Sequence, residues 1–386
     1  MTNTWTWKPF DDNNISTSLD IELLKIEVGK HFPFYDMRFN KDTAAFFCRI
    51  EKEVLEEKFD SLRKSLKEKG YIPMLKHEQG EHIIYIIKKP KRKEKPVWIN
   101  YLLLVSTIIT TILTGSILST GYLDVFSMPN PMDIFMGENL LKGALFFSLP
   151  LMSILIVHEM GHYIISKKHG ISTSLPYFIP VPPILGFNIG TFGALISSRD
   201  PMPNKKALFD VGIAGPLAGF LVAVPILIIG IATAGIEPII PYSNLPDGTV
   251  IFGKSILIEP IITRGLLQIP AGYTYSMTPL IFAGWVGLLI TAINLLPAGQ
   301  LDGGHIFRAV LGEKQKYVSW GAIFIMILTG WLFFAFVIIF LVGIMHPPPL
   351  NDDTDLGIKR KLFFIVAIIM LVFCYIINPL DVVVQP

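Results

Sequence analysis

The chain has 386 residues, of which 51% are hydrophobic and only 17% are charged, and its mean hydropathy is +0.52. Soluble proteins carry about 25% charged residues, so this composition excludes an ordinary soluble enzyme and indicates an integral membrane protein. The net charge of +2 is too small to predict a nucleic-acid partner, and we expect none.

The first 95 residues are polar and mixed, and we expect them to form a small cytoplasmic α+β domain with a linker. Its predicted elements are a helix over 20–30, a strand over 44–50, a helix over 51–69 and a hairpin of 71–77 with 81–88. No cleavable signal peptide is expected, so the first apolar segment would act as an uncleaved signal. The domain could gate access to a site, recognise the cytoplasmic tail of a substrate or form a homodimer.

Lysine and arginine dominate residues 88–95. The positive-inside rule interprets this linker as a topology signal that keeps the N-terminal side in the cytoplasm. The other interpretation is a contact with lipid headgroups or with a regulator.

Residues 96–386 contain six apolar segments near the length of about 20 residues that a spanning helix needs. They are Ile99–Leu118, Gly143–Ser166, Ala207–Ala234, Pro279–Ala298, Val318–Met345 and Leu362–Ile377. We therefore expect a mainly α, multi-pass protein of the cell membrane with six transmembrane helices and a cytoplasmic N-terminus. The cation-rich loops 167–206 and 299–317 then lie inside, and the loops 119–142 and 235–278 lie outside. One cluster disagrees, because Lys359–Lys361 falls outside by this count.

His158, Glu159 and His162 form an H-E-x-x-H pattern within the second apolar segment. Helix positions four apart share a face, so both imidazoles point at one spot with Glu159 beside them. Two neutral imidazoles suit zinc, and the carboxylate can act as a general base. A purely structural histidine pair is the other interpretation. Ionisable groups are costly in hydrocarbon, however, and usually persist there for function.

A further zinc ligand is needed, because catalytic zinc usually has three protein ligands and one open position. The fourth apolar segment reaches Asn294, and eight positions later the chain reads Asp302-Gly-Gly-His305. By the predicted topology this end is also cytoplasmic and can meet the histidine pair. Asp302 is the predicted third ligand and His305 is its chemical rival. A helix-capping carboxylate is the plain alternative for Asp302.

The two motifs together, H-E-M-G-H and N-x-x-P-x-x-x-x-D-G, resemble those of the site-2 protease family of intramembrane zinc metalloproteases. The resemblance implies that His158 and His162 bind Zn²⁺, that Glu159 is the catalytic glutamate and that Asp302 completes the zinc site. It also implies that Asn294 helps to hold the substrate carbonyl or its oxyanion.

Residues 210–219 resemble the small-residue stretch of the same family, although many members have asparagine where this chain has Gly219. We interpret the stretch as a surface for close helix packing. Gly219 and the segment 187–194 are similar to the branch that includes chloroplast membrane homologues. The resemblance covers about residues 95–345, and the loop 235–278 is too short for the PDZ domain that some relatives carry.

Leu175–Ser197 is apolar but is broken by prolines and glycines, so it cannot form a spanning helix. Irregular backbone at membrane depth must be covered by protein or face water. We expect an extended hairpin beside the zinc site, whose free edge pairs with an unwound substrate strand and whose Asn188, Gly190 and Gly193 contact the substrate. The alternative is a loop that only plugs the cavity.

The remaining histidines and cysteines are assigned no catalytic role. His169 is expected to cap a helix or lie at the surface. His31, His77 and His82 lie in the N-terminal domain without paired spacing, and His346 precedes a run of prolines. The cysteines that we interpret as buried, unpaired thiols are Cys48 and Cys374.

The sequence therefore predicts an intramembrane zinc endopeptidase that cleaves transmembrane segments of membrane-protein substrates near the cytoplasmic leaflet. A helical substrate hides its carbonyls in hydrogen bonds, so local unwinding must precede attack. A zinc peptidase of the kind that trims prenylated protein tails is disfavoured by the motif at 294–302. The other alternative is a non-proteolytic zinc-binding membrane protein or a metal transporter.

Overall fold

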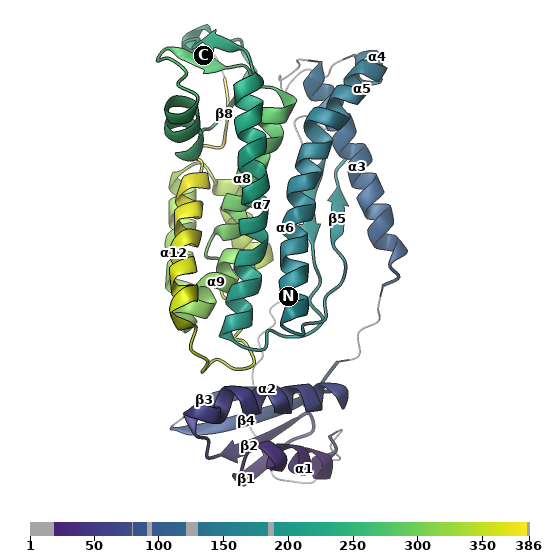
Figure 1. Cartoon of the computed structure of the whole chain (residues 1–386), viewed down its shortest axis with the longest axis vertical. Coiled ribbons are helices and arrows are strands. Elements are labelled where there is room, and N and C mark those ends of the chain that lie inside the picture. Colours follow the sequence, from purple (N-terminus) through teal and green to yellow (C-terminus); the bar gives the residue numbers. More distant parts are fainter. Residues whose placement is uncertain (1–18, 79, 91–94, 121–129, 184–188, 384–386) are drawn as a thin grey trace. The chain divides into compact units, whose positions relative to one another are not determined.

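The computed structural model describes residues 19–78, 80–90, 95–120, 130–183 and 189–383. The chain divides into two compact units (Figure 1). The first contains the described residues up to 90 together with 201–206 and 348–355, and the second contains 95–200, 207–347 and the residues from 356 onward. Each unit has its own apolar core.

The first unit is an antiparallel sheet with two helices against one face. Its elements are α1 (Ile21–His31), β1 (Phe34–Phe39), β2 (Thr43–Cys48), α2 (Lys52–Glu68), β3 (Tyr71–Glu78) and β4 (Glu81–Lys88), with the strands in the order β1-β2-β4-β3. Alternate strand residues such as Phe46 and Ile84 pack with Phe59 and Leu62 of α2 in one core. The predicted N-terminal α+β region is confirmed, and β1 is an edge strand that the sequence analysis did not predict.

Two segments from much later in the chain complete this unit. The amide of Leu75 in β3 donates to the carbonyl of Leu350 (2.7 Å), and the amide of Leu350 donates to the carbonyl of Met202 (2.8 Å). The amide of Asn351 donates to the carbonyl of Pro203 (3.0 Å). The edge of the four-stranded sheet is therefore extended by the residues that lead into two helices of the second unit.

The second unit is built around apolar helices (Figure 1). Its α-helices are α3 (Trp98–Ser119), α4 (Pro131–Ile134), α5 (Gly137–Gly143), α6 (Leu149–Lys168), α7 (Lys205–Thr233), α8 (Pro279–Leu295), α9 (Asp302–Leu311), α10 (Gln315–Leu328), α11 (Leu332–Val337) and α12 (Gly357–Cys374). Its π- and 3₁₀-helical turns are η1 (Ala144–Ser148), η2 (Tyr242–Asn244), η3 (Leu257–Leu266), η4 (Gly312–Lys314) and η5 (Ile338–Val342). Its strands are β5 (Tyr177–Pro180), β6 (Thr191–Leu195), β7 (Ile236–Pro238), β8 (Val250–Phe252), β9 (Tyr273–Tyr275) and β10 (Leu380–Val382), paired as β5-β6, β7-β9 and β8-β10.

Three helical runs in the described residues are long and apolar enough to cross a membrane. They are Trp98–Ser119, Gly137–Lys168 and Lys205–Thr233. The second run continues from α5 through η1 into α6, so it begins several residues before the predicted span. Pro279–Leu295 and Leu332–Val342 are shorter apolar helices. The chain is thus a mainly helical membrane protein with three helical runs of spanning length among its described residues, and the prediction of six transmembrane helices is not confirmed.

The predicted span Val318–Met345 is not one helix. The chain turns at Gly330, whose φ of +82° suits glycine, and a Cβ there would overlap the side chain of Asn378. The two legs start and finish together, because the Gln315 side-chain amide donates to the carbonyl of Ile344 (3.2 Å). A long apolar run has the same composition whether it crosses or turns back, so hydropathy could not reveal this turn.

The helix that follows, α12, begins at the same end of the unit as α7. The guanidinium of Arg360 donates from Nε and Nη2 to the two carboxylate oxygens of Asp210, each at 2.7 Å. The expected assignment of Lys359–Lys361 to the side opposite the start of α7 is therefore wrong, because the turn between α10 and α11 adds a reversal that the count of spans omitted.

Candidate metal centre

The two histidines of the H-E-x-x-H pattern lie one turn apart on α6, on the face that packs against other helices. Their rings meet edge to face with centroids 4.9 Å apart, and the two Nε2 atoms are 3.1 Å apart. His158 and Glu159 are buried, and the side chain of His162 is 12% exposed. Glu159 directly follows His158, so it lies about 100° around the helix from it.

Asp302 is brought to this pair by a tight turn after α8. α8 ends at Leu295, and Asp302 is the first residue of α9. A Cβ on Gly303 would overlap the carbonyl oxygen of Leu295, and one on Gly304 would overlap that of Gly299. The glycines after Asp302 therefore let the start of α9 fold closely against the end of α8, which a larger residue would prevent.

The side chains of His158, His162 and Asp302 form a compact donor group. Oδ2 of Asp302 lies 3.4 Å from Nε2 of His158 and 3.2 Å from Nε2 of His162. Together with the distance of 3.1 Å between the nitrogens, these values define a nearly equilateral triangle. Ligands about 2.0–2.1 Å from a tetrahedral zinc ion are roughly 3.3–3.4 Å from one another. The donor types and their spacing therefore fit zinc with one position left open.

A backbone carbonyl on α7 sets the orientation of one imidazole. Nδ1 of His162 lies 2.8 Å from the carbonyl oxygen of Val211. A carbonyl oxygen only accepts, so Nδ1 carries the proton and Nε2 keeps its lone pair for a metal. Such outer hydrogen bonds fix the tautomer and the ring position of metal-binding histidines. No side-chain motif encodes this contact, so the sequence analysis did not identify it.

The small residues of α7 make the space that the histidine pair occupies. A Cβ on Gly215 would overlap the imidazole of His162, and one on Gly219 would lie 3.1 Å from Nδ1 of His158. A Cβ on Gly161 of α6 would lie 2.6 Å from the carbonyl oxygen of Ala214. The predicted close helix packing is present, and it serves the imidazoles as well as the backbones.

Asn294 and His305 differ in their relation to the donor group. The side-chain nitrogen of Asn294 lies 3.4 Å from Nε2 of His158, so its amide borders the group. Nδ1 of His305 donates to the carbonyl of Leu301 (3.0 Å), and its ring packs against His346 with centroids 4.4 Å apart. His305 is not part of the donor group that His158, His162 and Asp302 form, and its ring contacts His346 instead.

The segment between α6 and α7 contains the extended hairpin β5-β6, which lies between α3 and α6 (Figure 1). Gly190 has φ +79°, and the hydroxyl of Thr110 on α3 donates to its carbonyl (2.7 Å). Gly193 has φ +88° with open space where a Cβ would stand, and the neighbouring Phe192 is 79% exposed. Asn188, the third predicted substrate contact, lies outside the described residues.

His169 is the C-cap residue of α6, as the sequence suggested, but it also has a specific partner. Its Nε2 lies 3.0 Å from Oδ2 of Asp210, the carboxylate that also accepts from Arg360. The three side chains join the ends of α6, α7 and α12. Because this network depends on contacts between distant helices, the sequence offered only the basic character of the helix ends as a signal.

Comparison with known proteins places these motifs in a wider group. A family model described as Peptidase family M50 matches residues 146–341, just over half of the chain. The region contains the H-E-x-x-H pattern, the small-residue stretch of α7 and the motif that ends at Asp302.

Several curated plant proteins are similar to this chain. "Probable zinc metalloprotease EGY1, chloroplastic" of Oryza sativa subsp. japonica is 30% identical over 268 residues, which cover 65% of this chain and 44% of that protein. The protein of the same name from Arabidopsis thaliana is 31% identical over 259 residues, which cover 64% and 46%. "Probable zinc metalloprotease EGY2, chloroplastic" of Oryza sativa subsp. indica is 34% identical over 192 residues, which cover 48% and 32%. The match spans less than half the length of each of these relatives.

Proposed function

The chain belongs to peptidase family M50, and from this premise we propose that it is an intramembrane zinc endopeptidase that cleaves membrane-spanning segments of other proteins. The observation that carries the proposal is the triangle of donor atoms from His158, His162 and Asp302. This triangle lies within the apolar helical unit. Glu159, a buried carboxyl residue, directly follows His158 on the same helix. The names of the similar plant proteins also support a zinc-dependent peptidase.

In this proposal His158 and His162 bind zinc through Nε2, and Asp302 binds through its carboxylate. A zinc ion held there supplies Lewis-acid activation of water and of the scissile carbonyl. The hydrogen bond from His162 to Val211 keeps the ring in the tautomer that binding requires. The three donor side chains are only 5% to 17% exposed, so little bulk water reaches them. Electrostatic interactions are stronger in such an environment.

Glu159 acts as the general base and then as the general acid. It accepts a proton from the attacking water and later delivers it to the nitrogen of the leaving amine. Asn294, whose amide borders His158, donates to the oxygen of the substrate carbonyl as negative charge develops there. These two side chains contribute proton transfer and charge stabilisation, and they need not bind the metal.

The hairpin β5-β6 presents an unwound substrate segment to these groups. Its two strands pair only with each other among the described residues, so β6 retains an edge that can take a further strand. Gly193 and the exposed Phe192 lie on that strand. Gly190 has a packing role against α3. Its contribution to substrate binding would come through the position of the hairpin.

We propose that the N-terminal domain and the starts of α7 and α12 face the cytoplasm. The bidentate contact between Arg360 and Asp210 supports a common side for the two helix starts. The reversal between α10 and α11 then brings Lys359–Lys361 to the side that also carries Lys205 and Lys206. All the cation-rich connections share one side in this arrangement, as the positive-inside rule requires.

The proposal is tested with purified full-length protein and a model transmembrane peptide in lipid vesicles. We expect Glu159→Gln to retain one zinc ion at the donor group while cleavage falls by at least about 10²-fold. Glu138→Gln is a matched control, because Glu138 is exposed and forms a local ion pair with Lys142 one turn away on the same helix. Cleavage by Glu159→Gln at the wild-type rate would contradict the mechanism. Zinc binding without cleavage by the wild type would instead favour the non-proteolytic alternative.

In cells, comparative membrane proteomics of the wild type and Glu159→Gln would identify substrates. We expect uncut membrane proteins to accumulate in the variant, with the wild type producing fragments cut within their spans. An identical set of fragments in both strains would contradict the proposed activity.

A further inference from the structure

A second group of metal-binding side chains lies in the first unit, on the hairpin formed by β3 and β4. His77 and His82 are directly opposite each other in the register of these antiparallel strands. Their rings meet edge to face with centroids 4.6 Å apart. Directly opposed residues project to the same face of a sheet, so both imidazoles are presented together.

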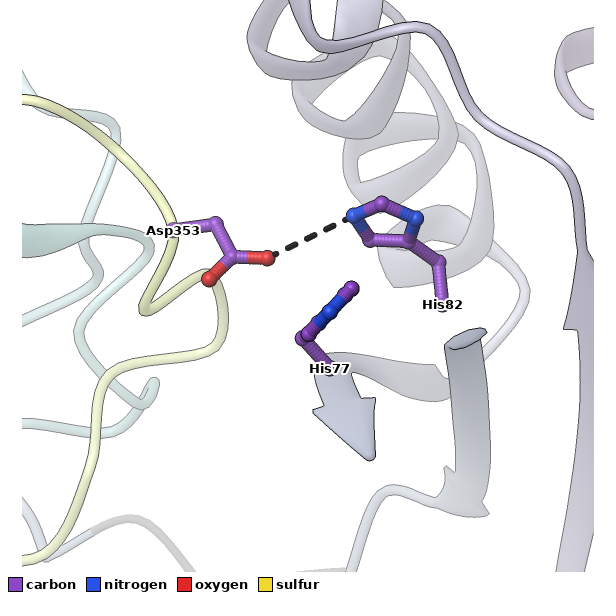
Figure 2. A group of neighbouring side chains, drawn as sticks. All are labelled: His77, His82 and Asp353. Carbon is purple, nitrogen blue, oxygen red and sulfur yellow. Dashed lines mark ion pairs between the residues drawn. The ribbon is translucent and has the colours of Figure 1, made fainter. Parts of the chain in front are cut away.

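A carboxylate from a distant part of the chain completes the group. Oδ2 of Asp353 lies 3.7 Å from Nε2 of His82, and one potential ligand atom from each of the three residues lies within 4.8 Å of the others. Figure 2 shows the carboxylate facing the His82 ring, with the His77 ring beside the gap between them.

The backbone around Asp353 is held in place, so the carboxylate is delivered by an anchored segment. The amide of Leu75, two residues before His77, donates to the carbonyl of Leu350. The amide of Asp353 donates to the side-chain oxygen of Asn351 at 3.0 Å, which forms a local turn. These backbone contacts therefore hold the β3 strand and the segment that carries Asp353 next to each other without any metal.

We propose that His77, His82 and Asp353 form a second divalent-metal site, suited to zinc, that clamps the segment 348–355 onto the β3-β4 hairpin. Two imidazoles and a carboxylate are a recurrent zinc ligand set. Bound donors would be roughly 3.3–3.4 Å apart, so donor atoms that lie within 4.8 Å of one another need to approach by at most about 1.5 Å. The exposed His77 and Asp353 can make such a movement towards the buried His82.

The exposure of the ligands defines the kind of site. The side chain of His82 is 10% exposed and that of Asp353 is 38% exposed, while His77 is an exposed residue. Water can therefore fill the remaining coordination positions, and metal can enter and leave without unfolding of the unit. These properties indicate an exchangeable site that responds to the free zinc concentration.

The position of Asp353 indicates what metal binding would change. Asp353 lies four residues before the first residue of α12, and the neighbouring Thr354 accepts a hydrogen bond from the amide of Lys205 at the start of α7 (3.3 Å). Metal binding would therefore restrain the segment that precedes α12, next to the residue that begins α7. This role uses no residue of the proposed catalytic centre.

The test measures zinc bound to full-length protein equilibrated with buffered micromolar free zinc. We expect about two ions per wild-type chain, about one in His77→Ala and in Asp353→Asn, and about one in Asp302→Asn, which removes a ligand of the other group. Asp352→Asn is the matched control, because it neutralises the adjacent carboxylate in the same segment. It should retain about two ions.

The two groups are distinguished by which variants lose an ion. If the catalytic proposal fails but the second site exists, Asp302→Asn binds as much zinc as the wild type while Asp353→Asn binds one ion fewer. If His77→Ala and Asp353→Asn both bind as much zinc as the wild type, the second site is refuted.

Hydrogen exchange supplies a readout that does not depend on stoichiometry or activity. Zinc should slow amide exchange in 348–355 of the wild type and of Asp352→Asn by at least about 10-fold. The same addition should leave Asp353→Asn unchanged. Equal slowing in Asp353→Asn would overturn the proposed clamp even if it folds normally.

Discussion

The imidazole of His162 is held between two features of α7, because its Nδ1 donates to the carbonyl of Val211 at 2.8 Å and its Nε2 faces the bare Cα of Gly215. The first contact sets which nitrogen is free to bind a metal, and the second leaves the room for that nitrogen. A segment that seemed suited to helix packing thus also defines the geometry of the donor group.

Replacing Gly215 by alanine should displace the His162 ring. The added methyl group would overlap Nε2, and the backbone of α7 cannot easily retreat, since Gly212 already packs closely against Asp302 and His305 of α9. We expect bound zinc to be lost and peptide cleavage to fall by at least about 10²-fold, because a displacement of about 1 Å has consequences of this size. Zinc content and cleavage are measured on the folded fraction.

The control for this change is Gly321→Ala. Gly321 lies within α10 and a Cβ there meets nothing within 4 Å. The control should retain zinc and cleavage and gain slightly in helix stability. Full activity in Gly215→Ala would contradict the tight fit described above.

The choice between Asp302 and His305 as third ligand has a direct test. We expect Asp302→Asn to weaken zinc binding by at least about 10²-fold, because it removes a charged donor that lies 3.2 Å from Nε2 of His162. His305→Ala should retain zinc, because His305 lies outside the donor group that His158, His162 and Asp302 form, and its ring packs against His346 instead. The zinc dissociation constant of each folded variant decides between them, and the reverse order would assign the ligand to His305.

The histidine pair could be predicted from sequence because helical spacing is a local property. The same is true of the N-terminal helices and of the hairpin 71–88, where apolar periodicity and a turn at Gly80 define the elements. Asp302 required more than spacing. Its approach to α6 depends on the fold of Gly303 against the end of α8. The ligand count of zinc and the predicted topology indicated Asp302 with His305 as a rival, and the motif resemblance then favoured Asp302.

Other features depended on contacts that sequence periodicity does not contain. The reversal at Gly330 depends on packing against Tyr375 and Ile376 beyond α12, where the Trp331 indole donates to the carbonyl of Ile376 at 2.7 Å. The group at His77 needs both the strand register that pairs it with His82 and the carboxylate of Asp353, from a much later part of the chain. Such contacts between distant residues cannot be predicted from the local patterns of a single sequence.

The stability of the first unit should depend on pH through Glu27. Hydrogen bonds from Lys30, then Lys69 and Ser65, lower the pKa of this buried carboxyl from 4.5 to about 2. Because the folded pKa is below the unfolded pKa, the ionised group stabilises the folded unit above about pH 4.5. This stabilisation declines as the pH falls from 4.5 towards 2.

The measurement compares the wild type with Glu27→Gln by hydrogen exchange of the α1 and α2 amides, corrected for intrinsic rates. Near neutral pH the variant should be less protected, because the ammonium partners lose their anion. The difference should shrink as the pH falls from 4.5 towards 3. A difference that stays constant over this range would show that the Glu27 charge does not stabilise the unit.

Because the chain reverses between α10 and α11, we predict that α12 begins on the same side of the membrane as α7. Single cysteines at Lys359 and Glu237 replace exposed side chains, whereas both native cysteines are buried. A membrane-impermeant maleimide should label Glu237→Cys from outside intact cells, and Lys359→Cys only in inside-out vesicles. The reason is that Arg360 pairs with Asp210 at the start of α7, while Glu237 lies just beyond the other end of that helix. Labelling of both positions from the same side would require α12 to run opposite to the direction given by the Arg360 contact.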